Sequence, residues 1–130
     1  MRVALLTREY PPNVYGGAGV HVEELSKVLA PHADVDVHAF DGPREAGASP
    51  AGVTVYGYDY PAELASANAA IKTLGVDLEI ADRVREADIL HSHTWYANMA
   101  GHIGGMLYGI PHVISAHSLE PLRPWKREQL

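Results

Sequence analysis

The sequence contains no cysteine, which excludes disulfide bonds and thiolate chemistry and fits a reducing compartment. It also lacks a long apolar run near its start, where the run Val3–Leu6 is far too short for the core of a signal peptide or a membrane span. Basic residues number 10 against 16 acidic ones, and the net charge of −6 argues against nucleic-acid binding through phosphate neutralisation. We therefore expect a cytoplasmic protein with no membrane or nucleic-acid partner.

The chain has 130 residues, 47% of them hydrophobic, which is enough to fill the core of one domain. Short apolar segments predict strands over residues 3–6, 35–40, 53–56, 87–93 and 112–117. Helices are expected from the glycines before residue 20 to about residue 30, over 62–87, which Gly75 divides or breaks, and over 97–108. Strands that alternate with helices predict an α/β fold with a doubly wound, Rossmann-like parallel sheet.

A glycine-rich turn, Gly16–Gly19, links the first predicted strand to the first predicted helix. Such a turn leaves backbone N–H groups free at the positive end of a helix dipole, where phosphate groups bind. The spacing matches neither the dinucleotide fingerprint nor the P-loop, so it names no particular nucleotide. A purely structural turn explains the glycines equally well, and the turn alone does not decide between the two interpretations.

Polar residues follow three of the predicted strands, at the glycine turn, at Ser92–Trp95 and at His117–Ser118. Ligands of parallel sheets bind beyond the carboxyl ends of the strands, where the strand order reverses. In a sheet with strand order 3-2-1-4-5, the first and fourth strands flank that point. We therefore expect the glycine turn and His93 to face each other across one cleft.

Three histidines near this edge raise the question of a metal site. His91 and His93 share one face of a strand, and His117 ends the neighbouring strand. A zinc site is conceivable, but no carboxylate or cysteine completes it, so we favour no metal. We expect His91 to be a half-buried strand residue bonded to backbone, and His93, which lies further out, to contact a ligand.

Catalysis by a nucleophilic side chain has little support, because no serine lies in a G-x-S-x-G turn. Glu9 and Glu120 flank the expected cleft, where solvated loop carboxylates are the favoured interpretation over acid/base catalysts. Aromatic residues follow the same strands, and they suit a sugar ring, although they are also good core residues. These aromatic residues are Tyr10, Tyr15, Trp95 and Tyr96.

Three motifs together resemble the glycogen synthases of GT-B architecture. They are residues 8–22 (REYPPNVYGGAGVHV), 88–98 (DILHSHTWYAN) and 109–126 (GIPHVISAHSLEPLRPWK). The third motif is particularly similar to the actinobacterial type, which is named either glycogen synthase or α-maltose-1-phosphate synthase. The resemblance covers nearly the whole chain and is weakest between residues 41 and 60.

The resemblance implies a retaining transferase of glycogen biosynthesis that moves glucose from ADP-glucose to α-glucose 1-phosphate or a glucan end, without a metal or other cofactor. By position it places Gly16 and Gly17 at the donor diphosphate and His93 at the reaction centre, as the catalytic residue. It assigns contacts with the acceptor or sugar to Tyr10, Trp95 and His117. Many glycogen synthases have a lysine two residues before the paired glycines, where this chain has Val14, so the charge that binds phosphate must come from elsewhere.

The resemblance also implies that residues 1–130 are most of a truncated N-terminal, acceptor-side domain. The C-terminal donor domain, with its paired glutamates and phosphate clamp, would lie outside this chain. We expect negligible transferase activity from the chain alone, and self-association through apolar surface that the missing part would cover. Two alternatives stay open: a GT-B transferase with an inositol, trehalose-type or lipid acceptor, and a non-enzymatic module that binds nucleotide or phosphate.

Overall fold

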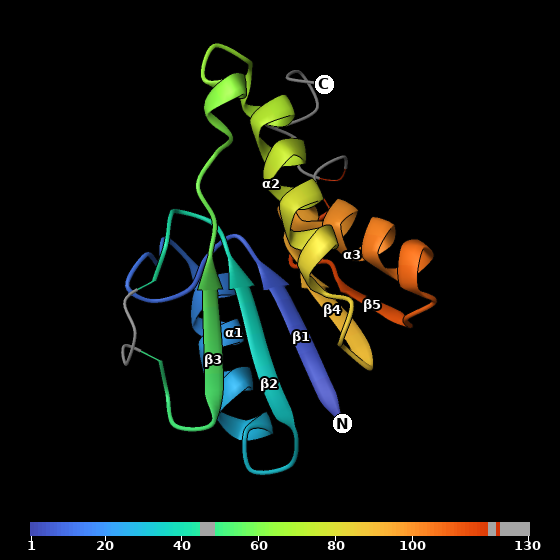
Figure 1. Ribbon diagram of the computed structural model, residues 1–130. Helices are drawn as coiled ribbons and strands as arrows, with labels where there is room; N and C mark the ends of the chain where they lie inside the picture. Colours follow the sequence, from blue (N-terminus) through green and yellow to red (C-terminus); the bar gives the residue numbers. More distant parts are fainter. Residues whose placement is uncertain (45–48, 120–121, 123–130) are drawn as a thin grey trace.

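The protein is a three-layer α/β domain in the computed structural model, which describes residues 1–44, 49–119 and 122 (Figure 1). Its strands are β1 (Arg2–Thr7), β2 (Asp34–Ala39), β3 (Val53–Gly57), β4 (Ile89–His93) and β5 (His112–Ser115). Its helices are α1 (Gly17–Leu29), α2 (Ala69–Arg83) and α3 (Thr94–Tyr108), and a 3₁₀ helix spans Ala62–Leu64.

All neighbouring strands pair in parallel, in the order β3-β2-β1-β4-β5. This order confirms the predicted Rossmann-like sheet and its switch point between β1 and β4. Leu5 pairs with Val37 of β2 on one side and with His91 of β4 on the other, so β1 is the central strand. The carboxyl ends of β1 and β4 therefore lie next to each other.

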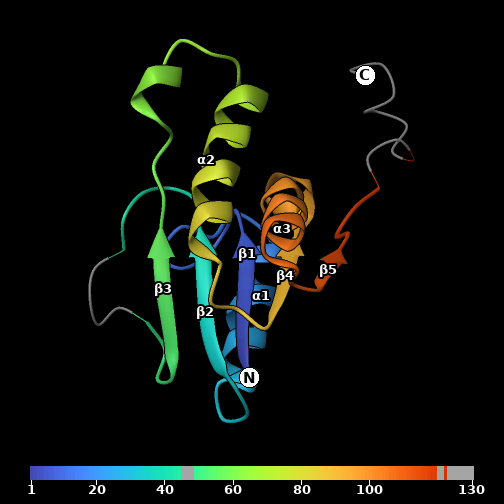
Figure 2. The same ribbon diagram turned by 45° about the vertical axis from the view of Figure 1, so that its right-hand side comes forward.

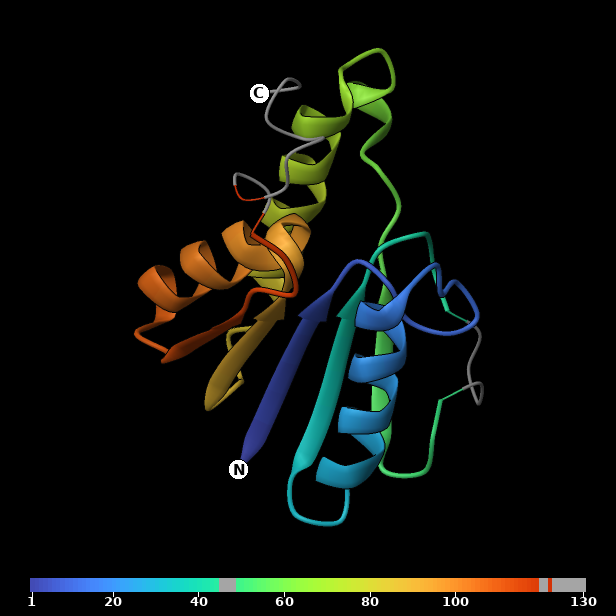
Figure 3. The ribbon, with the colours of Figure 1, turned by 180° about the vertical axis from the view of Figure 1, so that it is seen from behind.

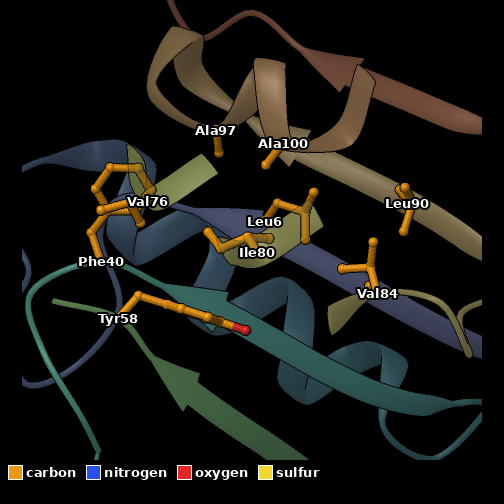
Figure 4. Close-up of a cluster of buried hydrophobic side chains, with 10 residues drawn as sticks. Leu6, Phe40, Tyr58, Val76, Ile80, Val84, Leu90, Ala97 and Ala100 are labelled. Atoms are coloured by element: carbon orange, nitrogen blue, oxygen red, sulfur yellow. The ribbon is translucent and has the colours of Figure 1, made fainter. Parts of the chain in front are cut away.

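Helices cover both faces of the sheet, with α2 and α3 on one face and α1 on the other (Figures 1, 2 and 3). Side chains of β1 alternate between the two layers, as expected for a strand buried on both faces. Leu6 packs in the cluster under α2 and α3, together with Phe40 and Ile80 (Figure 4). Leu5 packs in the second cluster, under α1, with Val22 of that helix. The two clusters are the cores that hold the layers together.

The predicted break at Gly75 is wrong, because α2 runs through it without interruption. A Cβ atom at this position would lie 2.6 Å from Cδ1 of Leu64, so the glycine allows close packing of α2 against the 3₁₀ helix. The break lies earlier, before Asn68, whose side chain accepts a hydrogen bond from the N–H of Ile71 and caps α2.

Two other element boundaries differ from the prediction. Helix α3 begins at Thr94, directly after β4, instead of at residue 97, and it ends as expected at Gly109, which has a φ of 65°. Strand β5 ends at Ser115, so His117 lies in the loop beyond it. The early start of α3 leaves no connecting loop between β4 and α3, which fixes the position of His93.

The layer on the α1 side is incomplete over β4 and β5. In the described part of the chain, α1 is the helix on this face (Figure 3), and it packs against β1 and β2. Val113 of β5 is 45% exposed, in agreement with a strand that lacks a cover on this side. None of the helices in the described ranges is long and apolar enough to cross a membrane.

Candidate functional site

A cleft of about 340 Å³ opens beyond the carboxyl ends of β1 and β4, at the predicted switch point. Its walls come from the loop after β1, the start of α1 and the start of α3. The lining residues are Thr7, Arg8, Glu9, Tyr15, Ala18, Thr94 and Tyr96. A smaller cavity of about 170 Å³, lined by Arg2 and Glu86 among others, lies near the amino-terminal end of β1. Ligands of parallel sheets bind at the opposite edge, so the larger cleft is the candidate site.

Arg8 places a positive charge in the cleft. Its guanidinium donates a hydrogen bond to the Tyr60 hydroxyl at 3.0 Å and lies 4.8 Å from the centre of the Tyr96 ring. These contacts hold the side chain extended beside an aromatic face. The sequence identified no residue to supply the charge that binds phosphate, because Val14 stands where many glycogen synthases have a lysine. Arg8, which lines the cleft, is a cation that can take this role.

The carboxylate of Glu9 is bound to the glycine turn, so the expectation of a solvated loop carboxylate is wrong. Its two oxygens accept hydrogen bonds from the backbone N–H groups of Tyr15, at 2.9 Å, and Gly19, at 3.1 Å. A carboxylate in this position satisfies donors at the start of α1 and interacts favourably with the helix dipole. Glu120, the other acidic candidate, lies outside the described residues.

The glycines of the turn have different surroundings. A Cβ atom added to Gly19 would lie 2.9 Å from atoms of Glu9 and Val14, so close packing requires glycine there. A Cβ atom added to Gly16 or Gly17 would meet nothing within 4 Å. Among the described residues, no acceptor bonds to the N–H groups of Gly16, Gly17 or Ala18. Packing therefore explains Gly19 but leaves Gly16 and Gly17 unexplained.

His93 lies beneath two other histidines and is completely buried, so the expectation that it lies further out is wrong. Its Nδ1 is 3.1 Å from Nε2 of His117, and the ring of His21, on α1, lies 5.5 Å from its own. Burial, together with the neighbouring histidines, lowers the pKa of His93 to about 3. The ring is therefore neutral at physiological pH, and it can exchange hydrogen bonds but does not act as a cationic acid.

His91 is half-buried, as expected, but its hydrogen-bond partner differs from the prediction. Its Nε2 lies 2.8 Å from the hydroxyl of Ser115 on β5, instead of bonding to backbone. Burial, with smaller effects from nearby histidines, lowers its pKa as well. His91 thus ties β4 to β5 and supports the ring of His93, whose centre is 4.1 Å from its own.

Thr94 combines two unusual features at the junction of β4 and α3. Its φ is 66°, in the left-handed region that β-branched residues rarely adopt. Its hydroxyl oxygen is buried and has no hydrogen-bond partner among the described residues. Strained backbone and unpaired polar atoms gather at functional sites, and Thr94 lines the cleft.

Of the three residues predicted to contact the sugar or acceptor, the structure places two beside the site and one in the core. Tyr10 is 2% exposed, and its hydroxyl lies 2.8 Å from Ser26 Oγ, so its side chain belongs to the core under α1. Trp95 is 51% exposed and stacks on Tyr96, which lines the cleft. His117 is exposed beside His93. Trp95 and His117 thus border the site, whereas the side chain of Tyr10 does not reach it.

Sequence reasoning missed His21, Arg8 and Thr94. His21 follows Ala18 by three residues on α1, so both face the same side, and this spacing was a usable signal. Arg8 directly follows β1 and was recognisable as a charged residue at a strand end. The residue type of Thr94 gives no indication that its backbone is left-handed.

A parallel sheet with its cleft at the switch point defines a class of Rossmann-like domains that includes those of GT-B glycosyltransferases. Within this class, the chain belongs to glycosyltransferase family 4, whose model matches residues 15–130. Over 130 residues it is 52% identical to an α-maltose-1-phosphate synthase of Mycolicibacterium smegmatis and 55% identical to one of Mycobacterium tuberculosis. Both alignments cover 100% of this chain and 32% of the relative, so the chain spans about a third of the length of these curated relatives.

Solved structures agree on the fold. HepE of Anabaena in complex with UDP superposes with a TM-score of 0.61 at 18% identity, over 96% of this chain and 31% of that one. A trehalose-6-phosphate protein from E. coli bound with UDP-2-fluoro glucose gives a TM-score of 0.58 at 14% identity, over 98% and 37% of the two chains. At these identities the likeness supports the fold alone.

Proposed function

We propose that this chain forms the acceptor-side domain of a retaining glucosyltransferase of glycogen biosynthesis. The donor is ADP-glucose, and the acceptor is α-glucose 1-phosphate or a glucan end. The bond from the glucose C1 to the diphosphate breaks, and a bond from C1 to an acceptor hydroxyl oxygen forms, with release of ADP and the hydroxyl proton. Support comes from the family membership and from the 52% and 55% identity to proteins named α-maltose-1-phosphate synthase.

One observation carries the proposal: the cleft offers two separate groups for anions beside an aromatic ring. The free N–H groups at Gly16 and Gly17 suit the donor diphosphate, because helix N-termini bind phosphate through backbone donors. The Arg8 guanidinium suits the phosphate of the acceptor, to which it can donate two parallel hydrogen bonds. Tyr96, which lines the same cleft, adds aromatic surface that suits a sugar ring.

His93 is proposed as the residue that contacts the donor sugar at the reaction centre. Because its pKa is about 3, it would exchange a hydrogen bond with a sugar hydroxyl in neutral form, and it would not protonate the leaving group. His21 and His117 cover it, so contact requires one of these exposed side chains to move aside. Trp95 and His117 are proposed as outer sugar contacts, and Tyr10 is left out because its side chain is in the core.

The donor domain is proposed to lie in the part of the relatives that this chain does not match. The alignments with both mycobacterial relatives cover 32% of their length. In two-domain transferases the second domain supplies the charges that bind the leaving diphosphate, so we expect the chain alone to bind ligands weakly and to turn over no ADP-glucose. Measurable turnover by the purified chain would contradict this division of roles.

The test is an amide-shift titration of the chain with α-glucose 1-phosphate and, separately, with ADP-glucose. We expect shifts centred on Arg8, Gly16, Gly17 and Thr94. An Arg8→Gln variant should lose most of the response to α-glucose 1-phosphate. Arg85→Gln is the matched control, because Arg85 is an exposed arginine that stacks on Tyr108, away from the cleft.

Equal binding by the two variants would refute the role of Arg8. Shifts centred on the cavity near Arg2 would refute the choice of cleft. A response to free nucleotide with none to the sugar phosphate would favour the non-enzymatic binding module.

A further inference from the structure

We propose that His21, His93 and His117 form a binding site for a divalent transition metal of the zinc type, with three imidazole ligands and one open coordination position. Each of the three offers a ring nitrogen, and these nitrogens all lie within 4.8 Å of one another. The histidines come from α1, from the end of β4 and from the loop after β5, so the fold, rather than a local sequence motif, brings them together. The site goes beyond the proposed transferase reaction, which uses no metal.

The distances are close to those that a metal requires. Zinc binds histidine nitrogens at about 2.0–2.1 Å, which places tetrahedral ligand atoms about 3.4 Å apart. Nδ1 of His93 and Nε2 of His117 are 3.1 Å apart, so this pair is nearly in position. His21 is exposed on its helix and needs to approach by at most about 1.4 Å, the difference between 4.8 Å and about 3.4 Å, which side-chain rotation can provide.

The hydrogen bonding of His93 shows which of its two ring nitrogens faces the cluster. One of the two facing nitrogens, on His93 or His117, carries the hydrogen that joins the rings, and the other accepts it. The remaining nitrogen of His93, Nε2, is buried and has no partner among the described residues. Because Nδ1 is the nitrogen that faces His117, it is the one that would bind the ion, and Nε2 would then carry the ring proton. Metal binding requires a shift of one ring proton to its other nitrogen, and no net charge on the imidazoles.

The wider surroundings favour a cation over an anion. The Glu9 carboxylate lies close enough to His117 to act on it electrostatically, and it places a negative charge beside the cluster. His91, which the sequence grouped with these residues, is not part of the geometric group, and its Nε2 is bonded to Ser115. The structure therefore replaces His91 by His21 in the candidate set.

Calorimetric titration of the untagged 130-residue chain with Zn²⁺ tests the site, and visible absorption of bound Co²⁺ reports its geometry. We expect one ion per chain and an absorption intensity typical of tetrahedral Co²⁺. His21→Ala and His117→Ala should each weaken binding at least about tenfold, since loss of even an outer-shell partner costs that much. Both residues are exposed, so the variants should fold, which circular dichroism can verify.

The control variants are His32→Ala and His102→Ala, which remove exposed histidines outside the cluster and should bind Zn²⁺ like the wild type. A His93→Gln variant, which keeps a polar side chain of similar reach, should also lose the site. The proposal is overturned if the wild type binds no Zn²⁺, if His21→Ala or His117→Ala binds it as tightly as the wild type, or if a control variant weakens it equally. None of these readouts depends on transferase activity or on a sugar ligand.

Discussion

Substitution of Gly16 or Gly17 by alanine separates the two explanations of the glycine turn. The added methyl group would meet nothing within 4 Å at either position, so it does not disturb the packing of the chain. Gly16 has an extended backbone, with φ of −165° and ψ of −169°, and Gly17 is the first residue of α1. Both conformations are open to alanine, so the fold itself does not require glycine at these positions.

The expected effects on stability and on binding have opposite signs. Replacement of glycine by alanine at a compatible position stabilises a protein by about 0.4–1 kcal/mol, because it restricts the unfolded chain. At the same time the methyl group projects into the space beside the free N–H groups, where a diphosphate would approach. Loss of one hydrogen bond to a charged group costs about 1.5–3 kcal/mol, which corresponds to a loss in affinity of about tenfold to a hundredfold.

The assay combines urea unfolding with a titration of ADP-glucose for the wild type, Gly16→Ala and Gly17→Ala. Gly19→Ala provides the contrast, since its methyl group would lie 2.9 Å from side-chain atoms of Glu9 and Val14 and should destabilise the turn. If Gly16→Ala and Gly17→Ala bind ADP-glucose as well as the wild type, the turn is not a phosphate site. If they unfold as readily as Gly19→Ala, the glycines are structural and the reasoning fails.

Two further predictions concern carboxylates. Burial raises the pKa of Asp77 to about 8, so the folded chain keeps a proton that the unfolded chain releases above about pH 4, and stability should fall as pH rises from 4 to 8. Asp77→Asn should unfold in urea like the wild type at about pH 3.5, where Asp77 is protonated in both states, but be more stable by at least about 2 kcal/mol at pH 8, and an unchanged difference between the two pH values would contradict this. Glu9→Gln removes a negative charge bonded to the N–H groups of Tyr15 and Gly19, and should raise ADP-glucose affinity about twofold to fivefold. Glu86→Gln, at the opposite end of the sheet, is its control, and equal effects of both would show only a change in net charge.

Local patterns predicted the sheet well. Apolar runs such as that in β1, and the glycines and prolines between elements, sufficed to predict the strands and the parallel sheet. The strand order that we assumed for the switch point is the order found, in line with the few topologies that right-handed crossovers allow. The error at Gly75 arose because a glycine weakens a helix in isolation, whereas here it permits contact with Leu64 and Pro61. Gly75 does lower the intrinsic helix propensity of this segment, but the packing that it permits keeps α2 continuous.

The candidate site was harder to predict, since its important contacts join residues far apart in the chain. The position of His93 at the switch point followed from the strand order, but its burial depends on His21 and His117, which only the fold brings near. The carboxylate of Glu9 looked solvated because its partners are backbone N–H groups, which no residue type reveals. Tyr10 was misjudged for a related reason: its partner, Ser26, lies 16 residues later on a neighbouring helix.

The proposed attraction of the cleft for anions is not evident from the composition of the chain. The net charge is −6, yet α1 and α3, which begin at Gly17 and Thr94, both contribute lining residues to the cleft, and neither has an acidic residue in its first turn. The backbone N–H groups at these helix starts and the charge of Arg8 are therefore the groups proposed to attract an anion. Because these donors are fixed by the parallel topology, mutation of surface acids elsewhere should leave ligand binding unchanged at moderate salt. If the proposed site is correct, its local field, rather than the net charge of the protein, decides which anions it binds.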